Sequence, residues 1–224
     1  MKTRVLFIAV LIPALCLLSG CRSNTKSSAA ETGEVTETQG HDISEPEPDS
    51  RGKGPLGVRS AIIEYTYSGD KTGKSTHYID DYGNKTAMYT ETSGDGELNR
   101  GWVVSSGDFQ YMWDPSNPGG GMKMKNPLLS LAAQGDLLSQ TEKIYEQMGM
   151  KKSGTEMFRG KECLVYKGPM GKVLIWNGIL MMMELNLGSV VSRQEATSIQ
   201  SNVRVDSKYF RIPENITFSE IPGF

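Results

Sequence analysis

The chain has 224 residues, and its 24 Lys and Arg against 26 Asp and Glu give a formal net charge of −2 at pH 7. Hydrophobic residues make up 38% of the sequence, enough for one domain with a sizeable core. No basic patch is present that could neutralise a run of phosphates, which argues against nucleic acid as a partner.

The first 20 residues have the pattern of an export signal. Lys2 and Arg4 precede an apolar run over residues 5–18 that is interrupted only by Pro13. The run is too short to span a bilayer comfortably, and small residues follow it. The pattern therefore predicts a cleaved signal peptide over residues 1–20 and not a transmembrane helix.

The stretch Leu18-Ser19-Gly20-Cys21 resembles the bacterial lipobox. This resemblance implies cleavage before Cys21, a diacylglycerol on its sulfur, and a membrane as partner through that lipid. Arg22 stands where such proteins carry an inner-membrane retention Asp, which favours the outer membrane, facing the periplasm. An ordinary signal peptide with an incidental cysteine is the alternative.

Residues 21–56 are predicted to form a lipid-anchored, disordered acidic tether. They are rich in Ser, Thr, Glu, Gly and Pro, and from residue 22 on they carry seven acidic and four basic side chains. Such a segment cannot bury enough apolar surface to offset its ordering entropy. As a flexible chain it would reach about 30–35 Å. The remaining residues, 57–224, are predicted to form one folded domain.

The domain begins with a pattern of short antiparallel strands. Residues 59–67 alternate, with Ala61, Ile63, Tyr65 and Tyr67 on one face. Polar turns and a loop over residues 93–99 separate the following segments. Further strands are predicted over residues 76–80, 85–92, 101–105 and 109–113.

Two short amphipathic helices are predicted in the middle of the domain. Asn126-Pro127 is a good start for the first helix, Asp136 can cap the second, and Gly149 would end it. Each helix needs an apolar surface to lie on. The residues expected to form such a lid are Leu128, Leu131, Leu137, Ile144, Tyr145 and Met148.

Strands resume after the helices, and Asn177-Gly178 is the strongest hairpin signal in the chain. The predicted fold class is α+β: a large curved antiparallel sheet, an incomplete β-barrel of about ten strands, with two short helices inserted as a lid. The later strands are predicted over residues 153–158, 163–167, 172–176, 179–187 and 190–200.

Several short motifs resemble those of the LolA/LolB-like lipoprotein-carrier superfamily, especially its lipid-anchored branch. They lie at residues 111–114, 121–127, 154–156, 160–166, 172–179 and 212–213. The resemblance spans residues 57–224 and implies an incomplete barrel around a helical lid, with an apolar cavity for acyl chains. It brings no catalytic residues. The long acidic tether departs from a diffusing carrier and suits an anchored receptor or sensor.

An acyl chain needs dry walls and few directional contacts, and its burial is favourable by about 0.8 kcal/mol per methylene. A curved, unclosed sheet offers such walls on one face. The same residues could equally form a filled core. The side chains expected to share this face and line a cavity are Ile63, Tyr65, Tyr111, Trp113, Ile175, Ile179, Met181, Met183 and Leu185.

The run Met181-Met182-Met183, with Met122 and Met124, allows three interpretations: a copper(I) site, an adaptable lipid-facing surface, or core filling. In a strand Met181 and Met183 lie on one face and Met182 on the other. The run therefore cannot present three sulfurs together, and core filling is favoured.

The sequence predicts no catalytic residue, metal site or cofactor. His41 and His77 are its only histidines, and neither belongs to a cluster of metal ligands. Asp80-Asp81 is typical of a solvated turn. Once Cys21 carries lipid, Cys163 has no disulfide partner in the mature chain, and it is interpreted as a small buried hydrophobe.

Two functional hypotheses follow. The first is a non-catalytic envelope lipoprotein that binds lipid or acylated cargo in an apolar cavity. The second is a protein-interaction or sensor module of the cell envelope, in which the half-barrel is a solid scaffold.

Overall fold

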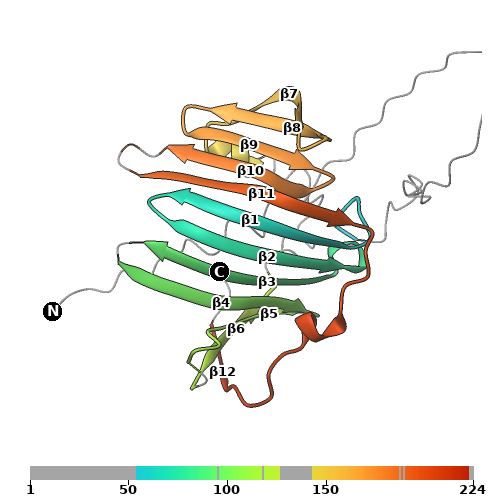
Figure 1. Ribbon diagram of the computed structural model, residues 1–224, viewed down its shortest axis with the longest axis vertical. Helices are drawn as coiled ribbons and strands as arrows, with labels where there is room; N and C mark the ends of the chain where they lie inside the picture. Colours follow the sequence, from blue (N-terminus) through green and yellow to red (C-terminus); the bar gives the residue numbers. More distant parts are fainter. Residues whose placement is uncertain are drawn as a thin grey trace, which may run out of the picture.

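The computed structural model describes residues 54–221, except for 95, 118, 127–142, 187 and 189. In this part of the chain, twelve strands form one sheet in the order β12-β6-β5-β4-β3-β2-β1-β11-β10-β9-β8-β7 (Figure 1). The two end strands, β12 and β7, do not pair with each other, so the curved sheet stays unclosed.

The first six strands form one meander and the next five form a second. The first comprises β1 (Ala61–Gly69), β2 (Thr72–Asp80), β3 (Lys85–Gly94), β4 (Glu97–Ser106), β5 (Phe109–Trp113) and β6 (Gly121–Lys125). The second comprises β7 (Lys151–Phe158), β8 (Lys161–Gly168), β9 (Gly171–Trp176), β10 (Ile179–Asn186) and β11 (Val191–Ser201). The chain then passes through the short helix η3 (Ser207–Phe210) to β12 (Phe218–Glu220).

The pairing of β1 with β11 joins the two meanders in the middle of the sheet. It runs antiparallel from Ala61 opposite Ser201 to Gly69 opposite Ser192, with a register shift at Glu64/Tyr65. The Tyr65 hydroxyl reaches past β11 and donates a hydrogen bond to the Leu180 carbonyl on β10, at 2.7 Å. A buried side chain therefore connects the two halves in addition to the backbone ladder.

The two faces of the first meander are distinguished by strand register. Ala61, Ile63 and Tyr65 are buried on one face, here called the inner face. The other, outer face carries Tyr78 and Trp102, because side chains of directly paired residues point to the same side. The alternation predicted for residues 59–67 is confirmed by the burial pattern of β1.

The buried apolar side chains form two clusters. Cluster 1 contains Leu56, Val58, Ala61, Ile63, Tyr65, Ile79, Cys163, Val165, Leu174, Ile179, Met181, Met182 and Ala196. Cluster 2 contains Tyr145, Met150, Tyr166, Val173, Ile175, Leu180, Met183 and Leu185. Cluster 1 contains residues of both meanders, whereas cluster 2 combines residues of the second meander with Tyr145 and Met150, which precede it.

The C-terminal segment packs on the outer face of the first meander. Tyr209 of η3 stacks on Tyr78 with ring centroids 3.8 Å apart. Phe218 of β12 meets Tyr111 and Trp113 edge to face at 5.3 and 6.1 Å. β12 pairs with β6 in parallel, the one parallel pair among the described strands. The fold is thus antiparallel except at this edge.

The structure corrects three predictions. Residues 93–99 are not a loop, because β3 and β4 continue to a tight turn in which Gly94 pairs with Glu97 and Gly96 has a φ of +76°. Twelve strands replace the expected ten. The two helices are not borne out: residues 127–142 lie outside the described residues, and the remainder of the second helix is a short helical segment at 143–147.

The Tyr65 hydrogen bond gives a direct test of how the halves are joined. Tyr65→Phe should lower the free energy of unfolding by about 1–2 kcal/mol, because the buried Leu180 carbonyl loses its donor. Tyr89→Phe is the matched control, because the Tyr89 hydroxyl makes only a long, exposed hydrogen bond of 3.4 Å to the Glu91 carboxylate. Urea titrations check both, and equal midpoints for the two variants would contradict the assigned role.

Candidate functional site

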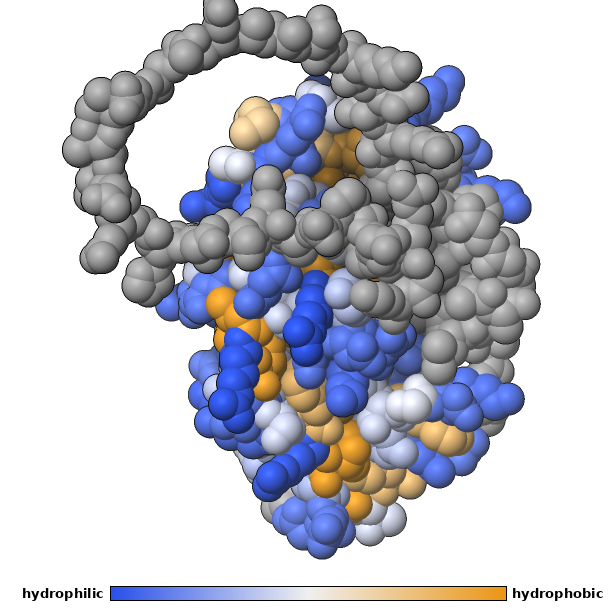
Figure 2. Space-filling model, turned by 90° about the vertical axis from the view of Figure 1, so that its right-hand side faces the viewer, coloured by the Kyte–Doolittle hydropathy of each residue, from blue (hydrophilic) through white to orange (hydrophobic). Residues whose placement is uncertain are grey.

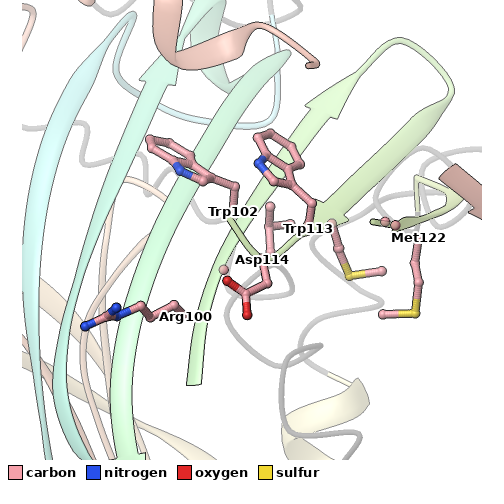
Figure 3. A pocket seen from close by; sticks show the side chains of 10 residues that line it. Arg100, Trp102, Trp113, Asp114 and Met122 are labelled. Atoms are coloured by element: carbon pink, nitrogen blue, oxygen red, sulfur yellow. The ribbon is translucent and has the colours of Figure 1, made fainter. Parts of the chain in front are cut away.

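An open groove of about 430 Å³ lies where β4, β5 and β6 meet. Its lining includes the apolar residues Trp102, Val103, Met112, Trp113 and Met122 together with Arg100 and Asp114, and Trp102 and Trp113 point to the opposite side from Asp114 and Met122 (Figure 3). Gly101, Gly120 and Gly121 complete the lining. This shape and chemistry suit an apolar chain more than a polar ligand.

Strand register explains how the groove forms. Trp102 pairs directly with Trp113, and their rings stack with centroids 6.2 Å apart. On the other side of the strands, Val103, Met112 and Met122 occupy successive paired positions. The sheet therefore divides the lining: Trp102 and Trp113 project from its outer face, whereas Val103 and the flexible Met112 and Met122 project from its inner face.

Gly121 is required for this arrangement. A Cβ on Gly121 would lie 2.5 Å from the Phe218 ring and 2.9 Å from the Met112 carbonyl oxygen. The missing side chain leaves the space in which the Phe218 ring packs against Trp113.

The charged groups at the groove mouth are one cation and two carboxylates. Arg100 Nε forms an ion pair with Glu91 at 3.2 Å. The pKa of Asp114 is lowered, chiefly by hydrogen bonds from the Ser116 hydroxyl and backbone N–H and to a smaller extent by Arg100. One cation faces two carboxylates, so the mouth offers no net positive charge to an anionic ligand.

Hydrophobic residues also reach the surface outside the groove. Figure 2 shows a stripe of them between hydrophilic residues on one side of the molecule. Met122 in the groove is 41% exposed, and Met157 on β7 is 66% exposed. The two methionines therefore form a natural pair for comparing a groove position with a surface position.

The structure separates the residues predicted to line a cavity. Ile63, Tyr65, Ile179 and Met181 pack in cluster 1. Ile175, Met183 and Leu185 pack in cluster 2. Tyr111 and Trp113 lie on the opposite face from Ile63, because successive pairing connects Ile63 with His77, Met88, Val103 and Met112. The prediction that all nine share one face is therefore wrong, and of the nine Trp113 lines the groove.

Only part of the predicted lid falls within the described residues. Tyr145 is buried in cluster 2, with its ring centroid 4.8 Å from that of Tyr166, and Met148 packs against the same cluster. Ile144 is half-buried. Leu128, Leu131 and Leu137 lie outside the described residues.

The methionine run is core. Met181 and Met182 are in cluster 1 and Met183 is in cluster 2. A bulge at Leu180/Met182 breaks the expected alternation of the three side chains. Six strands separate β10 from β6, which carries Met122 and Met124.

Cys163 is fully buried, as predicted. Its Sγ donates to the Lys161 carbonyl at 3.5 Å, and burial raises the pKa of the thiol to about 11. A neutral thiol in the core has little nucleophilic character.

Within the described ranges, no three His, Cys, Asp or Glu side chains lie where they could hold a metal ion together. None of the helices described there has the length and apolar character needed to cross a membrane.

Comparisons with known proteins give structural likeness at low identity. No protein-family model matches the sequence, and no curated protein gives a significant match. A conserved protein of Thermus thermophilus aligns with a TM-score of 0.49 and 8% identity, over 73% of this chain and 91% of that one.

Two further solved structures show weaker structural likeness to this chain. PNGF-II aligns with a TM-score of 0.42 and 11% identity, over 74% of this chain and 32% of that one. LprF from Mycobacterium bovis aligns with a TM-score of 0.32 and 9% identity, over 67% of this chain and 88% of that one. These likenesses assign the chain to no family, so the LolA/LolB-like resemblance stays a prediction.

Sequence reasoning missed most of the groove. Arg100, Met112 and Trp102 were not among the candidate site residues. The hairpin turn at Ser106–Phe109 was the available signal, because it places Trp102 opposite Trp113. The alternation of Gly, Met and Lys over residues 121–125 was a second signal, typical of a strand beside them.

His77 is the one described histidine, and its environment keeps it neutral. Its ring lies on the inner face against Tyr65, with centroids 4.5 Å apart. The residue is half-buried as a whole, but its Nε2 atom is shielded from solvent and has no hydrogen-bond partner. Burial lowers the pKa of His77 to about 4.

This depressed pKa predicts acid sensitivity. The unfolded chain binds the proton near pH 6.5 and the folded protein only near pH 4, so stability falls as pH falls through this window. Between pH 7 and pH 5 the loss due to His77 should be about 2 kcal/mol. His77→Phe should remove that part of the pH dependence in urea titrations. An unchanged pH dependence in the variant would contradict a buried neutral histidine.

Proposed function

We propose that the chain is a membrane-anchored envelope lipoprotein that binds an acyl chain of a lipid or acylated cargo in the β4–β5–β6 groove, without catalysis. The observation that carries the proposal is the groove itself, whose lining includes two tryptophans and two methionines and whose inner-face side chains, Val103, Met112 and Met122, are all apolar. Lipid on Cys21 and a tether over residues 21–56 would hold it at the membrane, and we propose the outer membrane.

The energetics favour an acyl chain over a compact polar ligand. Burial of eight methylene groups would contribute about 6 kcal/mol. Methionine side chains such as those of Met112 and Met122 adapt to an irregular acyl chain at little cost. The buried clusters 1 and 2, in contrast, are packed core, so we place the site in the groove and not between them.

The second hypothesis, a protein-interaction module, is supported by a different feature. β7 is an edge strand, and Lys151–Thr155 are exposed along it. An unpaired edge can receive a strand from a partner. In that case binding would depend on β7 and not on the groove.

The groove predicts saturable binding of fatty acids. A brominated fatty acid should quench tryptophan fluorescence when it is added to the protein without its predicted signal peptide and Cys21 (residues 22–224). Quenching is expected because Trp102 and Trp113 are among the residues that line the groove. Met122→Glu should weaken binding by about tenfold or more, because it places a charge in the apolar groove. Native mass spectrometry should detect the same complex.

Met157→Glu is the control, since it makes the same change in charge at an exposed methionine on β7. It should leave binding unchanged. Absence of quenching and of any acyl adduct in the unmodified chain would refute the proposed function. An equal loss of fatty-acid affinity in the two variants would show that the fatty acid does not bind in the groove.

A further inference from the structure

A polar patch lies on the inner face in the middle of the sheet. It is formed by Tyr67 of β1, Ser75 and His77 of β2, Thr90 of β3 and Gln194 of β11. Register places them together: Tyr67 is paired with Gln194, and Ser75 is paired with Thr90. His77 follows two residues after Ser75 on the same strand and face.

The patch holds hydrogen-bonding capacity that the described protein does not use. His77 Nε2, Thr90 Oγ1 and Gln194 Nε2 are all buried without a hydrogen-bond partner. Leaving such groups unpaired is costly, and native proteins rarely tolerate several together. Three such atoms lie together on one face, so they could be satisfied by one polar group of a ligand.

Tyr67 and Ser75 complete the polar surroundings. The Tyr67 hydroxyl oxygen is 3.0 Å from Ser75 Oγ. Burial raises the pKa of the Tyr67 phenol, and the Ser75 and Thr90 hydroxyls counter part of the rise. Of these two hydroxyls only that of Ser75 has hydrogen-bonding geometry, so Thr90 Oγ1 stays available to another group.

The patch carries no charge at neutral pH. Its members are hydroxyl, amide and imidazole side chains, and burial holds the pKa of His77 at about 4. An ionised carboxylate or phosphate placed here would lose its hydration without gaining a cation. An uncharged group with both donors and acceptors fits instead.

The patch adjoins the proposed acyl groove. Thr90 pairs directly with Gly101, which lines the groove, and His77 is followed across the strands by Met88 and then by Val103 of the groove wall. A ligand with its polar end on the patch would therefore direct its apolar end along the inner face into the groove.

We propose that the polar patch of Tyr67, Ser75, His77, Thr90 and Gln194 recognises the uncharged, hydroxyl-bearing head of a glycerolipid whose acyl chain occupies the groove. The inference rests on the proposed function and adds a headgroup class to it. It predicts that the protein binds a neutral glycerol ester more tightly than a free fatty acid.

Calorimetric titration of residues 22–224 with monolauroylglycerol and with laurate, each below its micelle concentration, tests the inference. The ester should bind about tenfold more tightly than laurate, because only its head can satisfy the patch. His77→Phe and Gln194→Leu should each reduce this preference severalfold and leave laurate binding unchanged. Thr90→Val is a milder variant that removes one hydroxyl at nearly constant shape.

Gln200→Leu is the matched control, because Gln200 is exposed on β11 and pairs with Ile62 on the outer face. It should change neither affinity. Equal affinity for the two probes, with patch variants that change nothing, would overturn the inference and leave the groove intact. Loss of both probes in folded patch variants would make the patch purely structural and overturn it too. Failure of the unmodified chain to bind either probe would refute the proposed function itself.

Discussion

The pairing of β1 with β11 is the constraint on which the rest of the structure depends. These strands are separated by more than 120 residues, yet they join at nine register positions in the centre of the sheet. Without them the chain would be two separate meanders, each with a long unpaired edge. Such long-range pairing requires a large loop-closure entropy to be overcome before contacts are gained, so we expect it to be a slow step of folding.

The same pairing brings the candidate functional elements together. Gln194 reaches the polar patch only because β11 lies beside β1, opposite Tyr67. The remaining members, on β2 and β3, are placed by local hairpins, and β4 continues this row to the groove. Recognition of a polar head thus depends on the long-range contact, whereas all residues that line the acyl groove come from one local meander.

The sequence predicted the architecture where local signals were strong. Alternation over residues 59–67 and the Asn177-Gly178 hairpin gave strands close to those observed. The polar residues 93–99 concealed a tight turn, although Asp95-Gly96 is itself a hairpin signal. The order of strands could not be read from periodicity, because alternation fixes which residues share a strand face but not which strands become neighbours.

The candidate site was less accessible to sequence reasoning for the same reason. Tyr111 and Trp113 alternate as convincingly as Ile63 and Tyr65, but nothing local states that they face opposite sides of the sheet. Their faces follow from register through β2, β3 and β4. The packing of Phe218 against Trp113 was equally hidden, since it depends on a parallel pairing across almost 100 residues and on the space left by Gly121.

The measurement that tests the central claim most directly is photocrosslinking with a monoacylglycerol that carries a diazirine near the end of its chain. Mass spectrometry of the digested protein would locate the adduct. With the head on the patch and the chain along the inner face of the groove, saturable adducts are expected on Val103, Met112 or Met122. Adducts confined to clusters 1 and 2 or to β7, or labelling that does not saturate, would contradict the account.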